Sequence, residues 1–268
     1  MQQITVNPFA ETASSPWSQC GVFLINLDRS PERLQMAHQS LAAAQVPYQR
    51  IAGFDASRED LSLCRIDAKS FQKTHGRAQP RKGEIGCFQS HVRAMEAFLA
   101  TDKETAIIME DDAVPEPWFE SGVAQLLAWR QAWDIAPLFH FHSGGPIPLR
   151  KSGDFKLTIF LAHVSSSAAY ILNRKAALKL LAHMSTQRAC VDHALFEKYT
   201  HGLRLRGISP MPMRLSSQAN ISTIGVENSG KLPFFKRFPT FVHRSVSALK
   251  IFGHALTELR REGFQLGR

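Results

Sequence analysis

Two short apolar segments, each followed by polar residues, constrain the fold of this chain more than any other feature. Residues 22–27 form an almost continuous apolar run of strand length, and residues 106–109 form a second one that leads into three carboxylates at 110–112. Runs of this kind are typical of parallel strands covered by helices on both faces. Because parallel strands need crossover connections, the sequence predicts an α/β protein with a mainly parallel sheet flanked by helices.

The elements between these segments fit that prediction. Ser30 and Pro31 are typical of the start of a helix, because serine caps helix N-termini and proline suits the first turn. The apolar positions after them predict a helix that ends before Pro47. Other expected elements are helices near 84–100, 118–133 and 173–184, and strands near 48–51, 138–142, 156–162 and 168–172. Residues 57–82 are polar without a firm period, and we interpret them as a surface segment able to close over a ligand.

The chain divides by composition into three regions. We expect a flexible lead-in at 1–19, a globular domain at 20–230 and a basic amphipathic helical tail at 231–268. The tail holds eight Lys and Arg against two Glu, so it carries +6 of the formal net charge of +9.

Apolar residues recur in the tail at helical spacing, from Phe238 through Phe241, Phe252 and Leu256 to Leu259. Two interpretations stay open: the helix packs on its own domain, or it lies on an anionic membrane surface. No nucleic-acid partner is expected, because no aromatic-interleaved basic motif is present.

Cysteine usage and hydropathy indicate the compartment. The four cysteines are scattered without a C-x-x-C pair, which favours a reduced, cytosolic setting over zinc or redox chemistry. Neither a signal-peptide pattern nor an apolar stretch of about 18 residues is found, so we expect a cytoplasmic protein that does not span the membrane.

The carboxylates of Glu110, Asp111 and Asp112 follow a buried strand, where ligands of open α/β sheets bind. Their mutual repulsion would be relieved by a divalent cation, and hard oxygen ligands favour Mg²⁺ or Mn²⁺. Because successive side chains alternate in direction, one of the two aspartates would ligate while the other orients a water or a sugar hydroxyl. Two alternatives remain: an acidic turn that caps the next helix, and the site of a metal-dependent phosphohydrolase.

Three segments in order carry a family resemblance: FLINLDRSPER at 23–33, GEIGCFQSH at 83–91 and IMEDDA at 108–113. With residues 167–181, 191–195 and 217–225, the sequence resembles glycosyltransferase family 25, the lipooligosaccharide-biosynthesis glycosyltransferases, over about 21–226.

The resemblance implies a GT-A-like nucleotide-sugar transferase that is commonly a galactosyl- or glucosyltransferase, uses a UDP-sugar and inverts the anomeric centre. A growing lipid-linked glycan of lipooligosaccharide or lipopolysaccharide would be its acceptor, at the cytoplasmic face of the membrane. The non-enzymatic alternative is a lipid- or nucleic-acid-binding protein with a decayed site.

The expected donor-binding residues are Asn26, Asp28, Arg29, Glu84, Ser90, His91, Asp111 and Gln218. Asp28 would bind uracil or ribose and Arg29 would neutralise the diphosphate, although a helix-entry turn explains both residues too. The expected metal ligands are Asp112 and Asp111.

Two residues are candidates for the base that deprotonates the acceptor hydroxyl. Asp192 is the first, because it is a lone acid at the start of a helix and matches an acidic position of the family, but a plain helix cap is the alternative. Glu110 is the second. His163, His193 and Gln218 are each available to complete the metal coordination.

Overall fold

A five-stranded sheet forms the centre of the protein in the computed structural model, which describes residues 15–197, 201–216 and 230–263. The strand order is β2 (Gln49–Ala52), β1 (Cys20–Asn26), β3 (Thr105–Glu110), β8 (Ala169–Asn173) and β5 (Ile135–Pro137). β1 pairs in parallel with β2 and β3, whereas β8 is antiparallel to β3 and to β5. Four of the five strands therefore run in the same direction and only β8 opposes them, so the sheet is mixed but mostly parallel in strand direction, as expected.

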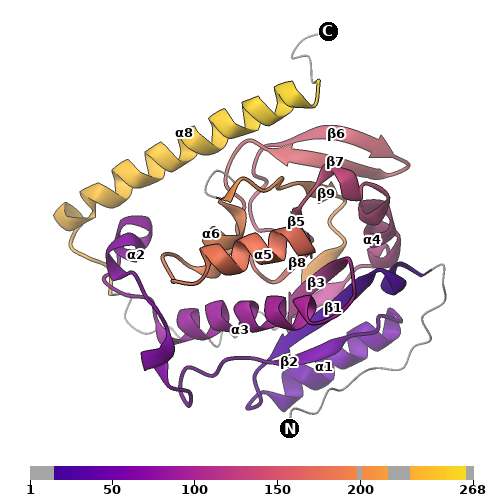
Figure 1. Ribbon diagram of the computed structural model, residues 1–268, viewed down its shortest axis with the longest axis horizontal. Helices are drawn as coiled ribbons and strands as arrows, with labels where there is room; N and C mark the ends of the chain where they lie inside the picture. Colours follow the sequence, from indigo (N-terminus) through magenta and orange to yellow (C-terminus); the bar gives the residue numbers. More distant parts are fainter. Residues whose placement is uncertain (1–14, 198–200, 217–229, 264–268) are drawn as a thin grey trace.

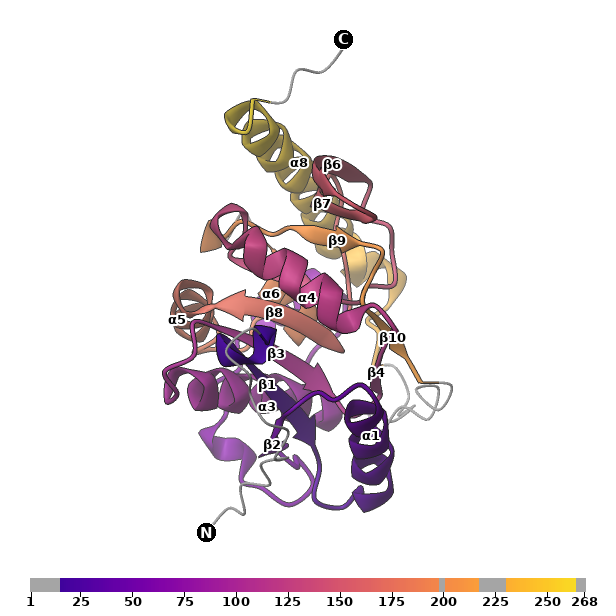
Figure 2. The same ribbon diagram turned by 90° about the vertical axis from the view of Figure 1, so that its right-hand side faces the viewer.

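Helices cover both faces of this sheet (Figures 1 and 2). Alternate strand residues explain the two layers: Phe23 and Ile108 belong to the core under α3 (Lys82–Leu99), α5 (Arg174–His183) and α6 (Val191–Phe196). Leu24 and Ile107 belong to the opposite core, under α1 (Pro31–Ala43) and α4 (Phe119–Ala128). Strands buried on both sides account for the continuous apolar runs in the sequence.

Smaller elements surround this centre. One sheet contains β6 (Pro146–Ser152), β7 (Phe155–Phe160) and β9 (Gly207–Ser209), and a second pairs β4 (Ala113–Pro115) with β10 (Met213–Leu215). The remaining elements are α2 (Ala68–His75), α8 (Phe238–Arg261) and the 3-10 turns η1 (Pro16–Ser18), η2 (Leu61–Leu63), η3 (Arg130–Ala132) and η4 (Phe234–Arg237).

Two sequence predictions of local structure were wrong. The segment 57–82 contains a helix, α2, which Asp67 caps at its start and Gly76 ends with a φ of 67°. Its apolar face is little more than Phe71, so the period was too weak to detect. The strand expected at 138–142 is β5, at 135–137, because the buried Asp134 just before it interrupts the apolar pattern.

Part of the expected lead-in packs on the domain. Trp17 is 4% exposed and its ring stacks on Phe119 at 5.7 Å between centroids. Within 15–19, the part of the lead-in that the structure describes, the chain is thus tied to α4.

The tail forms α8, which runs along the outside of the molecule from α2 to the β6–β7 hairpin (Figure 1). Ala255 and Leu259 pack against Ile159, and the buried Glu258 pairs with Arg206 at 3.0 Å. Most of the apolar stripe recognised in the sequence faces solvent instead, including Phe238 at 69% exposure and Leu249 at 72%. None of the helices in the described ranges is both long enough and apolar enough to cross a bilayer.

Candidate active site

A cavity of about 270 Å³ opens at the carboxyl ends of β1 and β3, beside the first turns of α3. Parallel pairing places Ile25 opposite Glu110, so the residues that follow the two strands meet at one edge of the sheet. The lining combines the carboxylates of Asp55, Glu110 and Asp111 with four cations, namely Arg29, Arg33, Arg81 and Lys82. We refer to it below as the basic cavity.

Asp111 is held by two partners in this cavity. Asn26 Nδ2 donates a hydrogen bond to Asp111 Oδ2 at 2.7 Å, and Arg33 forms an ion pair with Asp111 Oδ1. Burial raises the pKa of Asp111, and both partners act against that rise. Because both of its oxygens are engaged, Asp111 orients Asn26 and Arg33 and does not fit a direct metal ligand.

Asp112 has the opposite environment. Its Oδ1 is buried without a hydrogen-bond partner, and Arg33 reaches only Oδ2, at 3.4 Å. Burial, with the nearby charge of Glu110, raises the pKa of Asp112 to about 7. An unpartnered buried carboxylate oxygen beside another acid fits a hard divalent cation, so Asp112 is the residue that would hold Mg²⁺ or Mn²⁺.

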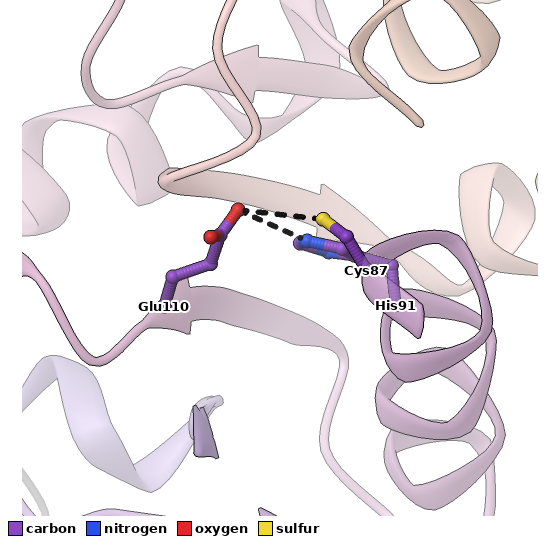
Figure 3. A group of neighbouring side chains, drawn as sticks. All are labelled: Cys87, His91 and Glu110. Atoms are coloured by element: carbon purple, nitrogen blue, oxygen red, sulfur yellow. Dashed lines mark hydrogen bonds and ion pairs between the residues drawn. The ribbon is translucent and has the colours of Figure 1, made fainter. Parts of the chain in front are cut away.

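Glu110 is surrounded by hydrogen-bond donors (Figure 3). Cys87 and His91 point towards it from α3: His91 Nε2 lies 3.3 Å from Glu110 Oε1, and Ser167 Oγ donates to the same oxygen at 2.6 Å. Burial works against ionisation, but the bonds from His91 and Ser167 outweigh it and hold the pKa of Glu110 below its ordinary value. Glu110 is therefore a carboxylate at neutral pH.

Cys87, His91 and Glu110 lie close enough to suggest a metal site, but their bonding argues against one. His91 Nδ1 lies 3.0 Å from the hydroxyl of Tyr170, so both ring nitrogens already have partners. Burial raises the pKa of Cys87 well above its ordinary value, which keeps it a thiol. The cluster is a hydrogen-bonded chain from Tyr170 through His91 to Glu110.

A second cavity, of about 370 Å³, adjoins the first. Cys87 and Glu110 line both of them. Four carboxylates line this acidic cavity, namely Glu84, Glu110, Asp112 and Asp192, and Phe141 borders it with 64% of its surface exposed.

The loop that follows β2 and contains Phe54 lines the basic cavity and is held in place by α3. Ser90 Oγ donates to the carbonyl of Gly86 at 2.7 Å and accepts from the backbone N–H of Phe54 at 2.8 Å. A Cβ on Gly86 would lie 2.7 Å from the carbonyl oxygen of Phe54, so only glycine allows this approach. Ser90 lines the cavity, but its hydroxyl is used to hold the loop.

The structure brings six of the expected residues together around the basic cavity: Asn26, Arg29, Ser90, His91, Glu110 and Asp111. Asp28 does not line it; its side chain is 71% exposed and pairs with Arg50 at 2.5 Å. Glu84 lies on the acidic side, where Arg77 pairs with it at 2.5 Å and the Arg81 N–H donates to it at 2.8 Å. Gln218 lies outside the described residues.

The lining residues that were not predicted as site residues include Arg33, Arg81, Lys82 and Ser167. Arg33 had a detectable signal, because it follows Ser30 by nearly one helical turn on a helix that begins at a strand end. Ser167 opens one of the segments that resemble the family, but its contact with Glu110 could not be predicted because only the tertiary fold brings the two residues together.

Comparison with known proteins agrees with this geometry. Residues 19–142 match the model of glycosyltransferase family 25 (LPS biosynthesis protein). A "Glycosyltransferase 25 family member" of Aedes aegypti is 30% identical over 110 residues, which cover 40% of this chain and 18% of that protein. The "Procollagen galactosyltransferase 1" of Danio rerio is 25% identical over 124 residues, covering 42% and 20%.

A relative from Bos taurus, named "Probable inactive glycosyltransferase 25 family member 3", is 27% identical over 122 residues, covering 42% of this chain and 20% of that protein. The chain thus spans about a fifth of the length of these curated relatives.

The α/β fold, with carboxylates and arginines gathered where parallel strands end, is consistent with the GT-A-like class of folds. The match of residues 19–142 to the model of glycosyltransferase family 25 agrees with the resemblance seen in the motifs.

Proposed function

We propose that the protein is a glycosyltransferase that moves a hexose, galactose or glucose, from a UDP-sugar to a hydroxyl of a lipid-linked lipooligosaccharide or lipopolysaccharide glycan, with inversion. The observation that carries the proposal is the pair of adjoining cavities, one basic and one acidic, which share Glu110. A group-transfer enzyme needs two substrates to meet at one point, and Glu110 lies at that point.

The basic cavity suits the nucleoside diphosphate. Arginine and lysine side chains bind diphosphate oxygens through charge-assisted hydrogen bonds, and Arg29 and Arg33 line the cavity at the strand ends. Arg33 is 24% exposed, so a ligand in the cavity can reach its guanidinium. A divalent cation on Asp112 would neutralise charge on the leaving diphosphate.

The acidic cavity suits the acceptor sugar. Carboxylates accept hydrogen bonds from sugar hydroxyls, and the exposed ring of Phe141 offers an apolar face for sugar C–H groups. We assign the base to Glu110, since it is ionised and borders both cavities. It would take the proton of the acceptor hydroxyl while the oxygen forms the new bond to the anomeric carbon and the bond to the diphosphate breaks.

A donor screen tests the transfer. The protein is mixed with a panel of nucleotide-sugars and Mn²⁺, and thermal stabilisation, sugar transfer and simple hydrolysis are measured separately. UDP-sugars should stabilise the protein and be consumed only with an acceptor. Release of phosphate from substrates without an acceptor would favour the phosphohydrolase alternative.

Variants test the two cavities. Arg33→Gln should weaken donor binding by about 10- to 100-fold, as expected for one lost charged hydrogen bond of about 1.5–3 kcal/mol. Arg58→Gln is the matched control, because Arg58 is 69% exposed and does not line the cavity. Glu110→Gln should reduce turnover by about 10² to 10⁴ without changing donor affinity. A larger loss in Asp192→Asn would transfer the base assignment to Asp192.

We further propose that α8 and η4 attach the protein to the cytoplasmic face of an anionic membrane. Phe234, Phe235 and Phe238 are each at least 69% exposed, beside Lys236 and Arg237. Exposed aromatic residues next to basic ones are typical of interfacial helices, and each basic residue near an anionic surface contributes about 1 kcal/mol.

Point variants test this attachment better than removal of the tail, because Ala255 and Leu259 are core residues. Replacing the three phenylalanines by serine should release the protein from vesicles that contain phosphatidylglycerol while leaving its melting temperature unchanged. The matched control replaces Leu63 and Leu178, which are 82% and 59% exposed elsewhere on the surface. Failure of the intact protein to float with anionic vesicles at low salt would refute the attachment.

A further inference from the structure

Two histidines and an aspartate converge beside the acidic cavity. His163 lies in the segment between β7 and β8, and Asp192 and His193 open α6. Three potential ligand atoms, one from each residue, all lie within 4.8 Å of one another. The rings of His163 and His193 are 4.4 Å apart between centroids.

His163 has a ring nitrogen, Nε2, that is buried without a hydrogen-bond partner. Buried polar atoms in folded proteins are nearly always bonded, so this unpartnered nitrogen requires an explanation. The structure thus places an unpartnered nitrogen of His163 beside the ring of His193 and the carboxylate of Asp192.

The surroundings supply the outer support that metal-binding histidines have. Glu197 Oε1 lies 3.6 Å from His193 Nδ1, in the position of a carboxylate that orients a ligating imidazole through its other nitrogen. His75 touches the ring of His193 edge-on at 5.0 Å. Its Nε2 accepts the backbone N–H of Cys190 at 3.0 Å, so His75 is fixed as a neighbour and not as a ligand.

We propose that His163, Asp192 and His193 bind a divalent transition-metal ion, Zn²⁺ in preference to Mg²⁺. Two imidazoles and a carboxylate are a ligand set that suits zinc, whereas Mg²⁺ selects all-oxygen sites such as the one at Asp112. Bonds to zinc of about 2.0–2.2 Å require the ligand atoms to approach one another more closely than they do now, which rotation of the side chains provides. Three protein ligands leave the fourth position to water.

Zinc here would change the chemistry of the acidic cavity, because Asp192 lines that cavity. A carboxylate bound to zinc cannot take a proton from an acceptor, so the metal-loaded protein would depend on Glu110 as its base. This consequence rests on the proposed glycosyl transfer, but the metal site does not, and it can be tested without any substrate.

The test is a zinc titration of the chelator-treated full chain against a chromophoric chelator. One zinc ion per chain should bind, and His163→Asn and His193→Asn should each weaken binding by at least about 100-fold, since outer-shell changes alone cost 10- to 100-fold. Glu197→Gln should weaken zinc binding by about 10- to 100-fold, as expected for a residue that only orients a ligand. Cys87→Ser and Asp112→Asn are the matched controls and should retain zinc. Their retention would distinguish the proposed site from the cluster around Cys87 and from the carboxylate of Asp112.

Cobalt spectroscopy of the wild-type protein gives an answer that needs no variant to fold. Co²⁺ should show the strong visible bands of a four-coordinate ion, without the sulfur-to-cobalt charge-transfer band that ligation by Cys87 would add. The proposal is overturned if the wild-type protein binds zinc no more tightly than a folded variant lacking both histidines. It is equally overturned if the Cys87→Ser or Asp112→Asn control loses the ion.

Discussion

Replacing Asp112 by asparagine should stabilise the metal-free protein at neutral pH. The carboxylate has a pKa of about 7 in the folded state, against an ordinary value of 3.8, because burial and the charge of Glu110 disfavour its ionised form. At about 1.36 kcal/mol per pH unit, that difference corresponds to about 4 kcal/mol of folding free energy. Asparagine resembles the protonated acid and avoids this cost.

The sign of the pH dependence follows from the direction of the pKa change. A group whose pKa is raised by folding contributes its full stability below its unfolded pKa and loses it as the pH rises through the folded value. The wild-type protein should therefore match the variant near pH 4 and fall behind it progressively up to pH 7, with a constant difference above that.

Urea denaturation of both proteins in EDTA, from pH 5 to pH 8, measures this difference. Groups distant from Asp112 titrate alike in both proteins and cancel in the comparison. Added Mn²⁺ should close the gap at pH 8 by stabilising the wild-type protein alone. A difference that stays flat with pH, or a variant that is less stable at pH 8, would refute the reasoning about Asp112.

Three further changes have defined outcomes. Asp134→Asn should destabilise the protein by about 3 kcal/mol at pH 7 in urea denaturation, because this buried carboxylate pairs with Arg204 at 2.9 Å. The bonds from Arg204 outweigh burial and hold the pKa of Asp134 well below its ordinary value, so the wild-type advantage should shrink as the pH falls below about 4. Leu259→Ala should cost about 2–3 kcal/mol by opening a cavity under α8, whereas Leu249→Ala, at a 72% exposed position, should change the free energy of unfolding by less than about 0.5 kcal/mol. Phe141→Ala should raise the KM for the acceptor by about 10-fold, the equivalent of about 1.4 kcal/mol, with donor affinity unchanged.

The centre of the fold could be predicted from the sequence because the patterns that indicate it involve residues close together in the chain. The apolar runs of β1 and β3 and the start of α1 required only periodicity and a capping preference. Both Asn26 and Asp111, which follow or end parallel strands, were expected among the donor-binding residues, and Asn26 Nδ2 lies 2.7 Å from Asp111 Oδ2.

Residues whose role depends on distant neighbours were beyond the same reasoning. Asp111 and Asp112 are adjacent in sequence and were treated alike, yet Asn26 and Arg33 occupy the first and leave an oxygen of the second without a partner. The difference depends on the side of the strand end that each carboxylate faces, and on α1, which supplies Arg33. Asp192 shows the same limit, because the neighbour that suggests a metal, His163, comes from another segment.

Helix α8 shows why an apolar stripe does not by itself identify a buried face. Periodicity correctly predicted the helix, but the face packed on the domain contains the charged Glu258, paired with the buried Arg206, while Phe238 and Leu249 remain in solvent. A helix selected only to cover its own core would bury its phenylalanines. Because this helix is anchored by Ala255 and Leu259 and turns its larger apolar residues outward, substitutions on its two faces should separate folding stability from membrane attachment.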